Sequence, residues 1–191
     1  MIILKHIVII LGDIYDLPSA NVICMKKIAD QLVVEGYKIT FVCQAQKSNQ
    51  LDYIEFDGYN VFFINVLSNR LWYYANMMKN ASAKTIKTFF WKSILLYLRI
   101  LQGIRAMFFW PSSSRWFIKK AFVKLKKIND ANKIDCIITV SIPYEAHLSG
   151  YKFKSYNKEV NWITYTLDSF AYSPTLQKYY IFKMFKKIIN K

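Results

Sequence analysis

The sequence predicts an α/β domain of Rossmann type, a three-layer arrangement in which helices cover both faces of a mainly parallel sheet. Short aliphatic runs rich in β-branched residues alternate with amphipathic stretches along the chain. The runs contain few polar residues, which is typical of strands buried on both faces. The chain has 191 residues, of which 54% are hydrophobic, so it is long enough to bury one core of ordinary size.

Five apolar segments are expected to supply the strands. Gly12-Asp13 is expected to stop the first of them, and the turn dipeptide Asp57-Gly58 divides the third into two short strands. In chain order the segments cover residues 7–11, 38–43, 53–66, 134–140 and 160–166.

Amphipathic stretches between these segments are expected to be helices. Ser19 or Asn21 can cap the first helix, and Gly36 suits the position just after its end. Ser114 can cap a second helix, which carries one apolar stripe and one lysine stripe, and residues 144–156 form a third. Residues Phe117, Ala121, Leu125 and Ile128 make up the apolar stripe of the second helix. Repeated strand–helix pairs of this kind predict a parallel sheet.

The charge of the chain is strongly unbalanced. There are 27 Lys and Arg residues against 12 acidic ones, a net charge of +15, which implies an anionic partner such as acidic lipid or nucleic acid. No Asp or Glu occurs from Gly58 to Asn129, where thirteen basic residues are interleaved with aromatic and aliphatic ones. Lys and Arg attract anionic headgroups by about 1 kcal/mol each, and Trp and Tyr favour the headgroup level.

Residues 70–128 are therefore expected to form a basic, aromatic, helical insertion that faces an anionic membrane surface. Its aliphatic content favours lipid over nucleic acid, and the remaining alternative is a solvated basic face over core-facing rings. The candidate membrane-facing residues are Trp72, Lys84, Lys87, Trp91, Arg99, Arg105, Trp116 and Lys120.

The three cysteines are widely spaced in apolar segments, which fits a reducing cytosol better than a disulfide framework. No charge-free stretch approaches the ~20 residues that a transmembrane helix needs. No His, Cys or acidic residues have the spacing of metal ligands, so no metal is expected. His6 lies in a strand and is expected to be structural.

The first candidate site is the loop that starts at Gly12 and Asp13. Parallel sheets bind ligands where such a loop enters a helix, and the free amides of the helix favour an anion or a sugar hydroxyl. The sequence contains neither G-x-G-x-x-G nor a P-loop, so no dinucleotide is indicated. The alternative is an ordinary strand-to-helix turn.

Two further candidates follow later strands. Ser141, Pro143, Tyr144 and His147 come after one of them, and the helix dipole should lower the pKa of His147 and keep it neutral. A neutral His147 could hydrogen-bond a substrate hydroxyl, or it could simply cap or pack. Asp168 follows the last strand, where it could accept a hydroxyl proton or orient a sugar, or cap the next segment.

Together these residues resemble the N-terminal, acceptor-side half of family-4-like glycosyltransferases, which have the two-domain GT-B fold. The segment 36–41 is similar to the family's G-H-x-V-x-V strand entry, and residues 161–168 resemble P-W-I-x-D-x-x-D in part. Members of the family often carry a third motif, D-x-I-x-x-S-x-P followed by H-x-x-G. This sequence has the same residues in the same order: Asp135, Ile137, Ser141, Pro143, His147 and Gly150.

The resemblance implies an enzyme of polysaccharide synthesis that moves a sugar from a nucleotide-sugar to a glycan or lipid-linked acceptor. It implies one GT-B half over residues 1–170, with 70–128 facing the inner surface of the cell membrane from the cytoplasm and 171–191 starting a linker helix. Asp168 and His147 would be catalytic, and the Gly12 loop would line the cleft. The only small-molecule requirement would be the nucleotide-sugar substrate, with no separate cofactor.

The 191 residues contain no E-x7-E motif, so the family's donor domain is expected to be absent from this chain. The chain is therefore expected to be truncated, or one half of a split enzyme that works with a separate donor-domain chain, and to be weakly active or inactive alone. The competing hypothesis is a non-enzymatic basic module that binds a membrane surface or nucleic acid.

Overall fold

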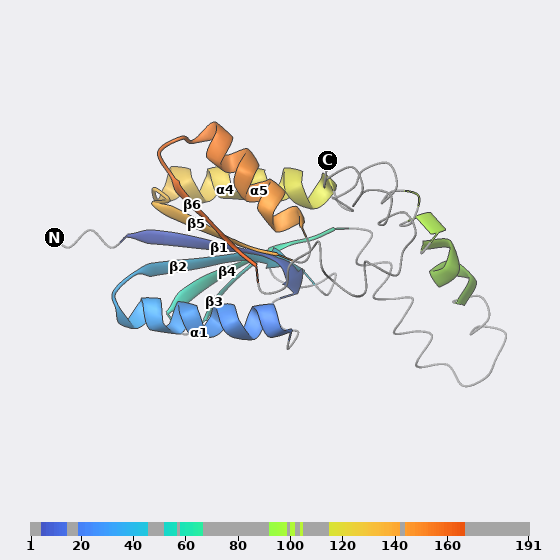
Figure 1. Ribbon diagram of the computed structural model, residues 1–191, viewed down its shortest axis with the longest axis horizontal. Helices are drawn as coiled ribbons and strands as arrows, with labels where there is room; N and C mark the ends of the chain where they lie inside the picture. Colours follow the sequence, from blue (N-terminus) through green and yellow to red (C-terminus); the bar gives the residue numbers. More distant parts are fainter. Residues whose placement is uncertain are drawn as a thin grey trace, which may run out of the picture.

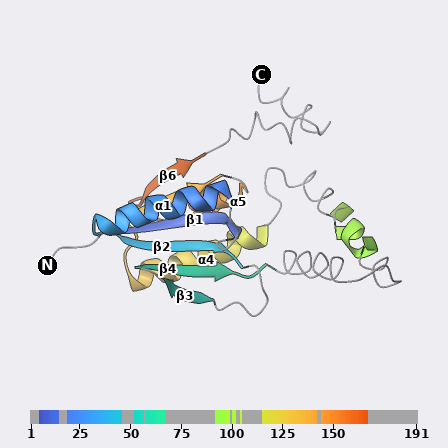
Figure 2. The same ribbon diagram turned by 90° about the horizontal axis from the view of Figure 1, so that it is seen from below.

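The computed structural model describes residues 5–14, 19–45, 52–56, 58–66, 92–98, 100–101, 104, 115–141 and 144–166. These residues include a six-stranded sheet with strand order β3-β4-β2-β1-β5-β6. All neighbouring strands are parallel except the pair β3 and β4. Helix α1 covers one face of the sheet, and α4 and α5 cover the other (Figures 1 and 2). The predicted mainly parallel, three-layer α/β class is therefore confirmed.

Every predicted strand and helix among the described residues is present, with small shifts at the ends. Residues 92–98 are helical as well, and so are residues 100–101 and 104. The elements are β1 (His6–Ile14), α1 (Ala20–Val34), β2 (Lys38–Gln44), β3 (Tyr53–Phe56), β4 (Tyr59–Ile64), α4 (Arg115–Ala131), β5 (Cys136–Val140), α5 (Glu145–Tyr156) and β6 (Asn161–Tyr165).

The first strand does not stop at Gly12-Asp13, and that expectation is wrong. β1 continues to Ile14, and its register with β2 shifts between Ile10, which pairs with Val42, and Ile14, which pairs with Gln44. Four steps along β1 therefore oppose two steps along β2, so the extra residues form a bulge around Gly12. A glycine inside a strand often marks such a bulge, where the backbone bends.

The caps of α1 follow the predicted chemistry. The Ser19 hydroxyl accepts a hydrogen bond from the Val22 amide at 3.3 Å, so Ser19 is the N-cap. At the other end Gly36 has φ of 86°, its amide donates to Val33, and the Tyr37 amide donates to Leu32. These two bonds form a Schellman motif, which ends the helix and turns the chain into β2.

The core has one layer on each face of the sheet. Alternate residues of β1 point to opposite faces: Ile7, Ile9 and Leu11 pack toward α1, whereas Val8 and Ile10 pack toward α4 and α5. Burying each such side chain contributes about 1.5–3 kcal/mol. The predicted apolar stripe of α4 is entirely buried in the second layer. Both faces are covered, which explains why β1 reads as a continuous aliphatic run.

His6, at the amino end of β1, makes hydrogen bonds to β2 and to the loop between α4 and β5. Its backbone amide donates to Asp135 Oδ2 at 2.8 Å, its Nε2 lies 2.8 Å from Thr40 Oγ1, and its Nδ1 lies 3.3 Å from the Asn132 carbonyl oxygen. Burial lowers the pKa of His6, partly opposed by the bond to Asn132. The structural role expected of His6 is confirmed.

Candidate functional site

The order of the strands places a topological switch point between β1 and β5. From β1 the chain builds β2 and β4 on one side, and it then returns to add β5 and β6 on the other side. The helices that follow β1 and β5 lie on opposite faces of the sheet (Figure 1). Ligands bind at such a switch point, beyond the carboxyl ends of the strands, because the loops diverge there and leave space between them.

Gly12 and Ser141 lie side by side at this switch point. Leu11 pairs with Val140 in the register of β1 and β5, so the next residues on both strands are neighbours. The Asn21 side chain in the first turn of α1 donates from Nδ2 to the Ser141 carbonyl oxygen at 2.8 Å. The Ser141 amide donates to the Tyr165 carbonyl oxygen at 2.9 Å. Segments that are distant in the sequence thus meet around Ser141.

The Ser141 hydroxyl is a polar group in an unusual position. The side chain is buried, and its Oγ has no hydrogen-bond partner among the described residues. A buried polar atom without a partner costs about 1–3 kcal/mol. Such an atom at the carboxyl edge of the sheet is suited to a ligand hydroxyl.

His147 is the third residue of α5 and faces the same edge. It is 8% exposed, its Nδ1 lies 2.7 Å from Thr139 Oγ1, and the Tyr144 ring packs edge-on against it at 5.6 Å. The pKa of His147 is lowered, as expected, but burial is the cause. Nε2 has no hydrogen-bond partner among the described residues and is the ring atom available to a ligand.

Thr139 sets the orientation of the imidazole. Its Oγ1 accepts a hydrogen bond from Trp162 Nε1 at 3.0 Å, and it lies 3.4 Å from the Ile163 carbonyl oxygen. The single hydroxyl hydrogen of Thr139 can go to His147 Nδ1 or to Ile163, and the shorter contact favours Nδ1. In that arrangement Nε2 carries the imidazole proton, so a neutral His147 can donate an N–H to a ligand at the switch point.

Gly150 allows α5 to lie close enough for these contacts. A Cβ atom at this position would overlap Thr139 Cγ2 and would lie 2.8 Å from Trp162 Nε1. Gly150 is three residues after His147, on the same side of the helix. The glycine therefore serves helix–sheet packing beneath the histidine.

Three residues at this site, Thr139, Trp162 and Glu145, were not predicted from the sequence pattern. Thr139 and Trp162 act through contacts across strands, which spacing alone does not reveal. Glu145 is buried in the first turn of α5, although acidic residues are rarely buried. The signal that could have found Glu145 is its position two residues before His147 in a region with few acids.

The expected site residues divide into two groups. Gly12, Ser141, Tyr144 and His147 come together at the carboxyl edge, whereas Pro143 and Asp168 lie outside the described residues, as does the Asp13 side chain. Of the membrane-facing set, Trp116 and Lys120 lie on α4, away from the switch point. The others, Trp72, Lys84, Lys87, Trp91, Arg99 and Arg105, lie outside the described residues.

Two further findings concern metals and membranes. In the part of the chain that the structure describes, no three His, Cys, Asp or Glu side chains gather to hold a metal ion. None of the helices described is long and apolar enough to cross a bilayer.

The fold resembles that of a known glycosyltransferase. A sucrose-phosphate synthase from Thermosynechococcus elongatus superimposes with a TM-score of 0.53 at 13% identity, over 97% of this chain and 40% of the synthase chain. The chain thus spans well under half of that protein. The likeness shows a GT-B glycosyltransferase-like, Rossmann-type fold and does not single out family 4.

Other comparisons are weaker. A second structure of the synthase has a TM-score of 0.45 at 11% identity, over 86% of this chain and 64% of that one. A tyrosyl-tRNA synthetase from Leishmania major has a TM-score of 0.40 at 10% identity, over 85% of this chain and 32% of that one. No family model and no curated protein matches the sequence.

Proposed function

We propose that this chain forms the acceptor-binding side of a glycosyltransferase that moves a sugar from a nucleotide-sugar to a lipid-linked or polysaccharide acceptor. The observation that carries the proposal is the convergence of Gly12, Ser141 and His147 at the switch point of a GT-B-like sheet. The Ser141 hydroxyl and the neutral His147 imidazole carry no charge, and Gly12 has no side chain to cover its backbone. Such groups suit sugar hydroxyls, which bind through several uncharged hydrogen bonds.

Each residue has a distinct role in this proposal. The bulge at Gly12 lets an acceptor approach the backbone, the Ser141 hydroxyl bonds one sugar oxygen, and His147 Nε2 bonds another. Tyr144 packs against the imidazole and restricts its rotation. Asp168 follows the end of β6 by three residues, and its carboxylate would accept the proton of the attacking hydroxyl.

The donor nucleotide-sugar is proposed to bind a second domain, in the same protein or in a partner chain. The matched synthase supports this, because more than half of its chain lies outside the matched part. Purified protein of this sequence should therefore turn over nucleotide-sugars very slowly by itself. Robust sugar transfer by the isolated chain would refute the proposal that the donor and the acceptor bind to separate domains.

Binding of glycosides tests the acceptor site directly. Saturation-transfer NMR with a panel of alkyl glycosides should detect contacts to the protein. His147→Ala should weaken binding by about tenfold, which corresponds to one hydrogen bond of ~1.4 kcal/mol. The control Ser155→Ala, at the exposed far end of α5, should bind as the parent does. Equal binding by both variants would contradict the proposal.

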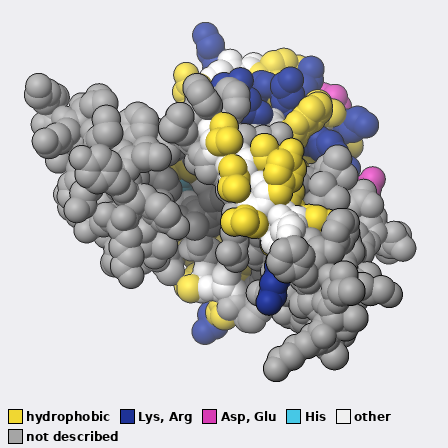
Figure 3. All heavy atoms as spheres, turned by 90° about the vertical axis from the view of Figure 1, so that its right-hand side faces the viewer, with side chains coloured by type: hydrophobic (Ala, Val, Ile, Leu, Met, Phe, Trp, Pro, Cys, Tyr) yellow, Lys and Arg dark blue, Asp and Glu magenta, His cyan; other side chains and the backbone are white. Residues whose placement is uncertain are grey.

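Attachment to an anionic membrane is proposed as part of this function. Within residues 92–104, Leu96, Tyr97, Ile100 and Ile104 are exposed at positions described as helical, whereas Leu95 is buried. Figure 3 shows hydrophobic side chains gathered on the side of the molecule where this segment lies in Figure 1. An exposed apolar surface within an acid-free, basic stretch supports insertion at the headgroup level.

Vesicle flotation tests this attachment. Leu96 and Ile100 are 60% and 53% exposed. Moving that exposed area into lipid contributes about 1–1.5 kcal/mol for each residue, so Leu96→Ser with Ile100→Ser should weaken binding to anionic vesicles by roughly thirtyfold or more. Val34→Ser, at an exposed apolar residue on α1, is the matched control and should leave binding unchanged. Equal flotation of both variants would remove this part of the proposal.

The competing function, a non-enzymatic membrane module, requires the same attachment surface but no acceptor site. Protein that floats with vesicles yet binds no glycoside would favour that module.

A further inference from the structure

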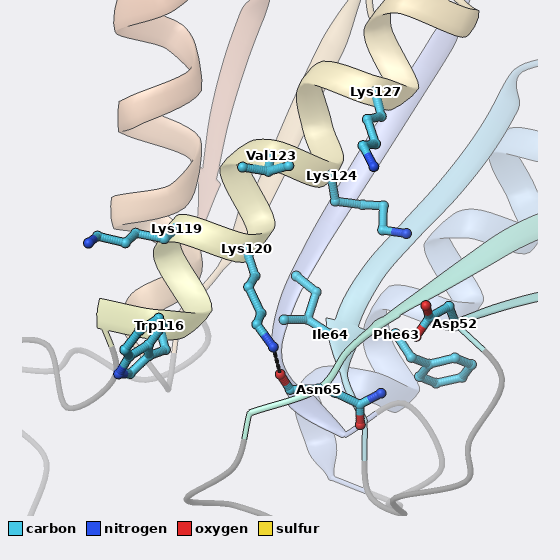
Figure 4. A pocket seen from close by; sticks show the side chains of 10 residues that line it. All are labelled: Asp52, Phe63, Ile64, Asn65, Trp116, Lys119, Lys120, Val123, Lys124 and Lys127. Carbon is cyan, nitrogen blue, oxygen red and sulfur yellow. Dashed lines mark hydrogen bonds between the residues drawn. The ribbon is translucent and has the colours of Figure 1, made fainter.

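A pocket lies between α4 and the carboxyl end of β4, separate from the switch point around Gly12 and His147. Its cavity has a volume of about 320 Å³. Four lysines of α4 line it (Lys119, Lys120, Lys124 and Lys127), together with Trp116 and, on the opposite wall, Asp52 (Figure 4). None of its lining residues belongs to the site at the carboxyl ends of β1 and β5.

The pocket has a marked excess of positive charge. Figure 4 shows Lys119 directed away from the other labelled lysines, so Lys120, Lys124 and Lys127 against Asp52 leave a formal charge of +2 around the cavity. The one ion pair found in the described ranges joins Lys133 to Glu159, elsewhere in the molecule. Lys120 and Lys124 are four residues apart, and Lys124 and Lys127 three, so these like charges repel one another along the helix.

The ammonium groups retain most of their hydrogen-bond donors. Lys120 Nζ donates to the Asn65 carbonyl oxygen at 2.6 Å, which uses one of its three hydrogens. Lys124 lies over the Phe62 ring at 4.9 Å, and Lys119 lies over the Trp116 ring at 5.8 Å. Lys127 has no hydrogen-bond or ion-pair partner in the described part of the chain. A bound anion would receive these donors and would relieve the repulsion.

The shape of the cavity limits the kind of anion. A concave space of this size matches small-molecule sites, whereas a nucleic-acid surface is an extended groove. Trp116 is 63% exposed at the edge of the pocket and offers a flat apolar surface beside the charges. Lysines act as point charges toward phosphate oxygens.

We infer that this pocket binds a ligand with a doubly charged phosphate or pyrophosphate group, whose ring or chain lies against Trp116. The phosphate belongs either to a soluble metabolite or to a lipid headgroup, since both present the same oxygens. The inference does not depend on the proposed glycosyltransferase function.

Calorimetric titration of the purified chain with inorganic pyrophosphate, at constant ionic strength, tests the soluble source. Binding should saturate at one site, and Lys124→Gln with Lys127→Gln should weaken it by tenfold or more. The matched control, Lys27→Gln with Lys158→Gln, removes the same charge from exposed positions outside the pocket and should change affinity by less than twofold. Trp116→Phe should remove any fluorescence change that accompanies binding.

Vesicles test the lipid source. Phosphatidic acid carries a terminal phosphate, and phosphatidylglycerol carries a phosphodiester. If a lipid phosphate binds in the pocket, the protein should bind phosphatidic acid more tightly than phosphatidylglycerol at matched surface charge. The variant with Lys124 and Lys127 replaced should lose this preference, and the control variant should keep it. Pocket-dependent binding in either experiment supports the inference and identifies the source. Equal losses in the pocket and control variants in both experiments would overturn it, since surface charge alone would then explain the binding.

Discussion

Replacing Gly150 with alanine should disturb the packing that supports His147. Gly150 faces the sheet where α5 crosses β5 and β6. A Cβ atom there would overlap Thr139 Cγ2 and would lie 2.8 Å from Trp162 Nε1. The helix or the indole ring must move to accommodate it, and either movement strains the hydrogen bond from Trp162 to Thr139.

The expected loss of stability follows from three contributions. Overpacking of a tight contact costs about 1–3 kcal/mol. A weakened Trp162–Thr139 hydrogen bond costs a further ~0.5–1.5 kcal/mol. Alanine has a higher helix propensity than glycine, which offsets about 1 kcal/mol. Gly150→Ala should therefore lower the free energy of unfolding by about 1–3 kcal/mol.

Urea unfolding followed by circular dichroism measures this loss. The second variant to test combines Gly150→Ala with Thr139→Ser, which removes the overlapping Cγ2 methyl group and keeps the hydroxyl. This pair should recover part of the lost stability, whereas Ser155→Ala on the exposed side of α5 should cost nothing. If Gly150→Ala is as stable as the parent chain, or if Thr139→Ser brings no recovery, the close packing at Gly150 is refuted.

Three other changes test the core, the buried histidines and the site. Phe117→Ala removes a fully buried ring and should cost about 3–5 kcal/mol in urea unfolding; a cost below 1 kcal/mol would contradict its burial. His6 and His147 have lowered pKa values, mainly through burial, so the unfolded chain binds more protons below about pH 6.5. The free energy of unfolding should be constant between roughly pH 7 and 8 and fall as the pH drops through 6.5, by up to about 1.4 kcal/mol per pH unit for each histidine, and a flat profile would refute this. Ser141→Ala removes a buried hydroxyl that lacks a partner among the described residues, so stability should stay equal or rise by up to ~1 kcal/mol while glycoside binding weakens. A substantial loss of stability would show instead that the hydroxyl is bonded within the protein.

Much of the fold could be predicted from the sequence because its local signals agree with one another. A strand that is buried on both faces must be aliphatic throughout, so β1 and β2 were visible as continuous runs. Ser19 begins α1 through a hydrogen bond of its hydroxyl, and Gly36 ends it through its positive φ angle. Both effects involve only residues that are close in the sequence. The placement of Ser141 and His147 at the carboxyl edge followed from the rule for parallel sheets.

The features that escaped prediction depend on contacts between distant segments. The bulge at Gly12 arises from the register of β1 against β2, so the same dipeptide could equally well have ended the strand. Thr139 and Trp162 are 23 residues apart and meet only because β5 and β6 are neighbours. The basic pocket likewise combines α4 with the end of β4. No local pattern encodes these neighbours.

Mapping the contacts of a bound glycoside tests the central proposal most directly. In a titration of isotopically labelled protein with an alkyl glycoside, the amide signals of Gly12, Ser141 and His147 should shift together and saturate with one affinity. Signals that shift instead at the opposite, amino edge of the sheet, around Lys5 and Asp135, or that do not shift at all, would contradict an acceptor site between β1 and β5.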